Sequence, residues 1–230
     1  MQRILLAVAL LIAAAGAPTR EETIERVVAV VNGQTILLSE WDTAARLEAL
    51  LDHKPLESIT DVSRRETLER RIDQELLRAE MQNSSLSPGS PEAIADRIHE
   101  IRQQYPEAAT EAGWATILAQ YGVTQQEVEA TVATELDGLR LIDFRLRSSA
   151  QPDSAQIARY YQSVYEPAMH AKRARPAPLA DVTQQIREIL TQQKLTEVTA
   201  TWLQSLRAQA NIQMNVRLPE VTGKPGPSLQ

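Results

Sequence analysis

Three histidines, His53, His99 and His170, are the side chains of this sequence best suited to metal binding or to proton transfer near neutral pH. His99 and Glu100 begin the pattern of a zinc peptidase helix. That pattern requires a second histidine four residues after the first, and Gln103 stands there instead. The histidines therefore predict no metal site, and we expect no cofactor.

The residues and motifs that other kinds of catalysis require are also missing from the sequence. The sequence has no cysteine, which removes thiol catalysis and most structural zinc sites. It contains no nucleophile elbow, phosphate-binding loop or dinucleotide fingerprint. A formal net charge of −6 argues against nucleic acid as a partner. We therefore expect a protein that is not an enzyme and acts by binding.

The elements that would position a binding surface are mostly helical, with a small β element. Residues 26–37 predict a β-hairpin, because a valine-rich run precedes Asn32-Gly33, a pair that tolerates the positive φ angles of a tight turn. Residues 211–217 alternate, with Ile212, Met214 and Val216 on one face, and we expect this strand to pair with the hairpin.

Capping residues and apolar stripes mark the helices between these strands. Ser63 with Glu66, and Thr124 with Glu127, match the capping box that opens a helix. The helix after Thr124 should bury one stripe, formed by Val128, Val132, Leu136, Leu139, Ile142 and Leu146. The last and longest helix is expected from Pro178 to about residue 210.

The N-terminus predicts export. Arg3 is followed by an apolar run of about a dozen residues and then by small residues up to Ala17, the pattern of a secretory signal peptide over residues 1–17. An uncleaved membrane anchor is the alternative, although the run is shorter than the roughly 20 residues that a membrane helix needs. Residues 218–230 hold several prolines and glycines and predict a disordered tail.

The order of these elements resembles SurA and related PpiC-type chaperones. The resemblance rests on the segment from Val27 to Glu40, on Tyr121-Gly-Val-Thr followed by Glu127, on residues 152–161, and on residues 179–212. It implies a SurA-like or trigger-factor-like helical chaperone core. Residues 18–165 would form its N-terminal region, and residues 178–217 would complete the same domain with the long helix and the strand.

The departure from the family pattern lies between these two parts. Where the resemblance places a parvulin-type isomerase domain, the sequence has about residues 166–177, a stretch with two prolines and a cationic run that we interpret as a linker. The segment is too short for a parvulin domain, so no peptidyl-prolyl isomerase activity is expected.

The resemblance implies a periplasmic, ATP-independent holdase for unfolded exported polypeptides, among them outer-membrane proteins. The alternative is a non-catalytic assembly or interaction subunit of a cell-envelope complex. We expect no stable membrane insertion after signal cleavage, and a homodimer is one possible assembly. Aromatic side chains are the candidate client contacts: Trp41, Trp114, Tyr121, Phe144, Tyr160, Tyr161 and Trp202. For Trp114, Tyr121 and Trp202, a place in the core is the stronger interpretation.

Overall fold

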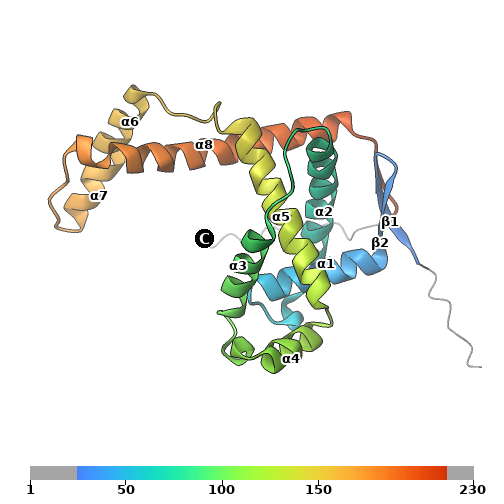
Figure 1. Cartoon of the computed structure of the whole chain (residues 1–230). Helices are drawn as coiled ribbons and strands as arrows, with labels where there is room; N and C mark the ends of the chain where they lie inside the picture. The colour runs from blue at the N-terminus through green and yellow to red at the C-terminus, as the bar shows by residue number, and fades with distance from the viewer. Residues whose placement is uncertain (1–24, 217–230) are drawn as a thin grey trace, which may run out of the picture.

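The computed structural model describes residues 25–216 as a helical body with a projecting arm (Figure 1). The predicted signal peptide and C-terminal tail therefore lie outside the described residues. The long helix α8 runs across the molecule, with the body at one end and the arm at the other. The elements of the body are β1 (Val27–Val31), β2 (Gln34–Leu37), α1 (Leu38–Leu51), α2 (Asp61–Gln82), α3 (Pro91–Arg102), α4 (Glu111–Tyr121), α5 (Gln125–Leu146) and β3 (Ile212–Met214).

The chain is mostly helical with a small antiparallel sheet, as predicted. The strand order is β2-β1-β3, so the C-terminal strand pairs with the hairpin at β1, with Val31 opposite Ile212. Asn32 and Gly33 have φ values of 51° and 87° in the hairpin turn, a conformation that Gly adopts without steric cost. Val28, Ile36, Trp41, Leu68 and Ile72 form the core beneath this sheet. On β3 the predicted face is interrupted, because Met214 is 40% exposed.

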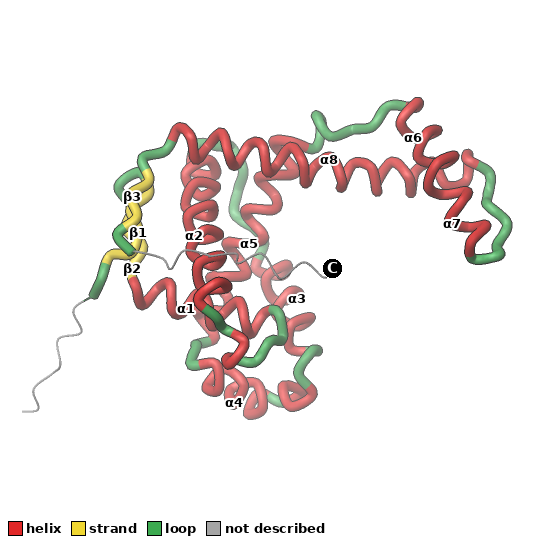
Figure 2. Tube along the Cα trace, turned by 180° about the vertical axis from the view of Figure 1, so that it is seen from behind, coloured by secondary structure: helices red, strands yellow, loops and turns green. Residues whose placement is uncertain are grey.

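A second core fills the opposite end of the body, where α1, α3, α4 and α5 meet (Figure 2). Thr124 and Glu127 open α5 as a capping box, as the sequence predicts, with their side chains and backbone amides bonded reciprocally. At α2 the capping prediction is wrong. Thr60 is the N-cap and Ser63 is its partner, so the helix begins one turn earlier than Ser63-Glu66 predicts.

The arm consists of α6 (Ser154–Tyr160), the π-helical turn η3 (Tyr161–Tyr165), α7 (Glu166–Ala171) and the first part of α8 (Leu179–Gln209). Ile157, Val182 and Ile186 form its small core. The segment 166–177, which the sequence predicts to be a linker, is helical in its first half and reverses the chain after Ala171. Together with the π-helical turn η3, this segment connects α6 to α8 in the structure.

Arg207 attaches α8 to the body. Its guanidinium donates to the Asp73 carboxylate at 2.6 Å, to the Glu69 carboxylate at 2.5 Å and to the Glu69 backbone carbonyl at 2.9 Å. These two carboxylates raise the pKa of Arg207, with the Asp73 hydrogen bond as the largest cause and burial as an opposing effect. The contact joins segments that are far apart in the sequence.

We expect Arg207→Gln to lower the free energy of unfolding by about 1–2 kcal/mol, because the charged donor of three hydrogen bonds, two of them to carboxylates, is lost at a partly exposed site. Urea unfolding followed by circular dichroism measures this. Arg187→Gln is the matched control, since Arg187 lies on the same helix and donates to the Gln184 side chain one turn away. Equal unfolding midpoints for the two variants would show that Arg207 does not secure α8.

Candidate functional site

A groove between α2 and α5 has a mainly apolar lining. It encloses about 450 Å³. Four apolar side chains from the two facing helices line it: Leu77 and Met81 of α2, and Leu139 and Ile142 of α5. Gly138 adds no side chain, which keeps the floor of the groove open. The groove is therefore a place where an apolar segment of another chain could be partly removed from water.

The rim of the groove is polar and charged. Gln74 and Arg78 of α2 face Thr134, Glu135 and Asp137 of α5 along its edges. Beyond the lining, Arg145 of α5 pairs with Glu80 of α2 at 2.7 Å and so links the two helices at the surface. An apolar floor with a polar rim keeps a binding surface soluble while leaving it available to a partner.

Leu139 is the most exposed large apolar side chain of the groove, at 63% of its full accessible area. The sequence predicts it in the buried stripe of α5, and that prediction is wrong at this residue. Val128 and Val132 of the same stripe are fully buried, because α1, α3 and α4 surround the first half of α5. On the groove side of the second half, no described element covers Leu139.

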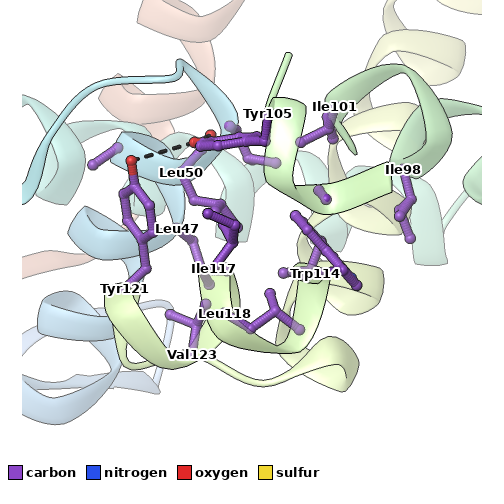
Figure 3. Packing of buried hydrophobic residues seen from close by; sticks show 14 of the residues in the cluster. Leu47, Leu50, Ile98, Ile101, Tyr105, Trp114, Ile117, Leu118, Tyr121 and Val123 are labelled. Carbon is purple, nitrogen blue, oxygen red and sulfur yellow. Dashed lines mark hydrogen bonds between the residues drawn. The ribbon is translucent and has the colours of Figure 1, made fainter. Parts of the chain in front are cut away.

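Two of the aromatic candidates lie in the core instead. Trp114 and Tyr121 of α4 are 3% and 9% exposed and pack among Leu47, Ile98 and other apolar side chains (Figure 3). The Trp114 indole donates to the Gln125 side chain at 2.6 Å. Their burial leaves no surface that a client could contact, in line with the interpretation of this stripe as core.

The Tyr121 hydroxyl belongs to a buried polar cluster. It donates to the Lys54 carbonyl at 2.8 Å and lies 3.3 Å from the hydroxyl of Tyr105, which donates to the Leu50 carbonyl. Burial raises the pKa of Tyr105, and the hydrogen bond with Tyr121 adds to the shift. The two hydroxyls thus satisfy carbonyls at the end of α1, which gives them a structural role.

Trp41 also has a structural position, in the core beneath the sheet. It is 6% exposed, and its indole donates to the Arg64 carbonyl at 2.6 Å. The Arg64 guanidinium lies over the Trp41 ring, 4.8 Å from its centre. This cation–π contact links α2 to α1.

The remaining aromatic candidates are at least partly exposed and belong to different elements, namely α5, the arm and α8. Phe144 near the end of α5 is 58% exposed and does not line the groove. Tyr160 and Tyr161 are half-buried in the arm, where Tyr161 donates to the Ala177 carbonyl and stacks on Tyr165. Trp202 is half-buried on α8. The structure therefore does not gather the seven aromatic candidates into one site.

The groove residues were missed from the sequence because they are aliphatic. Leu77 and Met81 are spaced by four and lie beside the apolar stripe that α2 buries, which includes Leu68, Ile72 and Leu76. An extra apolar pair beside that stripe is a signal for a second contact face on the helix. It could have been recognised, but nothing in the pattern indicates that the face stays open.

Within residues 25–216, His, Asp and Glu side chains do not gather into a group of three or more that could hold a metal ion. In the same residues no helix is both long and apolar enough to cross a bilayer.

Comparison with known proteins identifies one family. A family model described as a SurA-like N-terminal domain matches residues 1–141, which is more than half of the chain. None of the curated proteins searched matches the chain. The matched residues include β1, β2, α1 to α4 and most of α5, and therefore all of α2 and most of the residues that line the groove.

Proposed function

This chain belongs to the SurA-like N-terminal domain family, and we propose that it is an ATP-independent holdase for unfolded exported polypeptides in the periplasm. Outer-membrane proteins are the client class that the family resemblance suggests. One observation carries the proposal: the open groove between α2 and α5, with Leu139 exposed above an apolar floor. A client segment that enters it would bury apolar surface on both chains.

The dimensions of the groove fit weak and reversible holding. Fully burying one leucine-sized side chain is worth about 1.5–3 kcal/mol. A groove with four apolar lining residues can therefore hold a few client side chains, and the client can still leave to fold. The arm and the body project from the same long helix α8, which provides further surface on which a client chain could rest (Figure 1).

Light scattering tests the proposal. The full chain, at a molar ratio of about one to one, should slow the aggregation of several unrelated denatured proteins without ATP. Protection of none of them, together with co-purification of one folded partner, would contradict the holdase. That result would support the alternative of an assembly subunit in a cell-envelope complex.

We further propose that the chain has no peptidyl-prolyl isomerase activity. Among the described residues, the connection between α6 and α8 is a π-helical turn, one short helix and a loop. A proline-containing reporter peptide incubated with the protein should isomerise at its uncatalysed rate, over tens of seconds. Acceleration that depends on protein concentration would contradict this expectation.

A further inference from the structure

The α2–α5 groove adjoins, along its rim, a second and more polar chamber between α1 and α2. The chamber encloses about 610 Å³, and Gln74 and Glu135 line both the groove and the chamber. Glu135 therefore marks the point where an apolar surface meets a polar one. A segment bound in the groove would bring its next side chains to this carboxylate.

Carboxylates outnumber cations in the chamber. Glu48 pairs with Arg70 and Asp52 with Lys54, at 2.5 and 2.8 Å. After these pairs are formed, the carboxylates of Glu66 and Glu135 line the chamber as well. In the described part of the chain, neither has a hydrogen bond or an ion pair. The chamber therefore carries negative charge that the two cations of its own lining do not pair with.

Glu135 is also unfavourably placed for its own charge. Burial raises the pKa of its carboxyl, and although Arg97 opposes the shift, the negative charges of Glu48 and Asp52 add to it. A half-buried carboxylate whose charge is only partly compensated by Arg97 lowers the stability of the free protein. A neutral glutamine of nearly the same shape would avoid this cost, so the acid is better explained by a bound cation than by packing.

The elements that precede the arm carry a net negative charge, as the chamber does. Residues 25–153 contain 13 Lys and Arg against 23 Asp and Glu, a net charge of −10. Residues 154–216, which form the arm, the rest of α8 and the C-terminal strand β3, contain 7 against 4, a net charge of +3. The net negative charge of these elements, which include α2 and α5, thus favours the approach of basic segments over acidic ones.

We propose that the groove and the chamber together bind an extended client segment in which a Lys or Arg stands beside large apolar residues. The apolar side chains lie on Leu77, Met81, Leu139 and Ile142, and the cation pairs with Glu135. This inference rests on the proposed holdase function and narrows its client class to segments that are both apolar and basic.

Peptide binding to the full chain tests the charge preference. Three labelled 12-residue peptides share a Leu- and Phe-rich core and differ at one central position, which is Arg, Gln or Glu. By fluorescence anisotropy, we expect the Arg peptide to bind about 3- to 10-fold more tightly than the Gln peptide, and the Glu peptide to bind most weakly. Glu135→Gln should remove the preference for Arg over Gln.

The matched control is Glu129→Gln. It makes the same charge change on the same helix, but Glu129 is exposed, accepts a hydrogen bond from Gln125 and does not line the groove or the chamber. This variant should keep the preference for the Arg peptide. If both variants lose it equally, the preference comes from net charge and the assignment to Glu135 is overturned.

A second readout separates binding from folding. Because the pKa of Glu135 is raised in the folded state, its ionised form destabilises the protein above the usual pKa of a glutamate, and the effect is absent at lower pH where both states are protonated. Glu135→Gln should therefore raise the melting temperature by about 1–3 °C at pH 7 and leave it unchanged near pH 4. A stabilised variant that binds the Arg peptide as tightly as the wild type would overturn the proposal.

The remaining outcomes are also distinct. If the wild type prevents aggregation but binds all three peptides equally, this inference fails while the holdase stands. If it neither binds the peptides nor prevents aggregation, the holdase itself fails. If Glu135→Gln changes the sedimentation coefficient in a concentration-dependent way and leaves peptide binding unchanged, the chamber binds the basic residues of a second copy, and the client assignment is wrong.

Discussion

Leu139→Asp is expected to increase, by about tenfold, the amount of protein needed to protect a denatured client from aggregation. Leu139 is the most exposed apolar residue of the α2–α5 groove, so the substitution places a charge on the surface that a client's apolar side chains would cover. The loss of one buried leucine contact, at about 1.5–3 kcal/mol, corresponds to at least a tenfold change in affinity. Light scattering of several clients, titrated with each variant, measures the shift.

The fold should not change in this variant. Leu139 is 63% exposed, and its replacement removes little packing, so the melting temperature should stay within about 2 °C of the wild type. Phe144→Asp is the matched control, because Phe144 lies on the same helix, is similarly exposed and does not line the groove. If Phe144→Asp impairs protection and Leu139→Asp does not, the client surface lies on the outer face of α5 and the groove is not the site.

Trp114→Ala should have the largest effect on stability. The side chain is 3% exposed and fills the core between α3, α4 and α5, where its removal leaves a large cavity (Figure 3). Truncation of a buried tryptophan costs about 3–5 kcal/mol, a large share of the stability of a typical domain. Thermal unfolding should show a melting temperature lower by about 10 °C.

Trp114→Phe separates this structural role from a role in client binding. Phenylalanine keeps most of the ring volume but loses the hydrogen bond to Gln125 and the contact with the Arg102 guanidinium, which lies 5.6 Å from the ring centre. We expect a smaller destabilisation, of about 1–2 kcal/mol, and unchanged client protection at a temperature where the variant is folded. A Trp114→Ala variant with wild-type stability and impaired protection would instead place Trp114 among the client contacts.

The helical class and the closing of the chain ends could be predicted because local residue chemistry decides them. Asn32-Gly33 tolerates the positive φ angles that a tight hairpin turn requires, and Thr124 with Glu127 satisfies the free amides at the start of α5. The alternation from Ile212 onward gave the third strand, since a two-stranded hairpin needs a further partner to be stable. Each of these signals lies within a few neighbouring residues, although the pairing of β3 with β1 that follows is a long-range contact.

The start of α2 shows where local chemistry was ambiguous. Thr60 with Ser63 and Ser63 with Glu66 both offer a hydroxyl followed by a polar side chain three residues later. The structure uses the first pair, and Trp41 donates to the Arg64 carbonyl within the turn that this choice adds. The contact with Trp41, which is distant in the sequence, thus accompanies the helix start at Thr60. The local sequence pattern could not distinguish this start from the one at Ser63.

The sequence by itself determined that this protein has a helical core with paired ends, because capping residues, turn residues and apolar periodicity act over short distances. The order of these elements also showed the resemblance to SurA-like chains. Which apolar residues stay exposed was decided by the tertiary structure alone. Val132 and Leu139 belong to one stripe of α5, yet the first is buried and the second is open, since burial depends on which helices reach that part of α5. Glu135 is likewise an ordinary acidic residue in the sequence, and only the meeting of α1, α2 and α5 places it, without a described partner, at the end of an apolar groove.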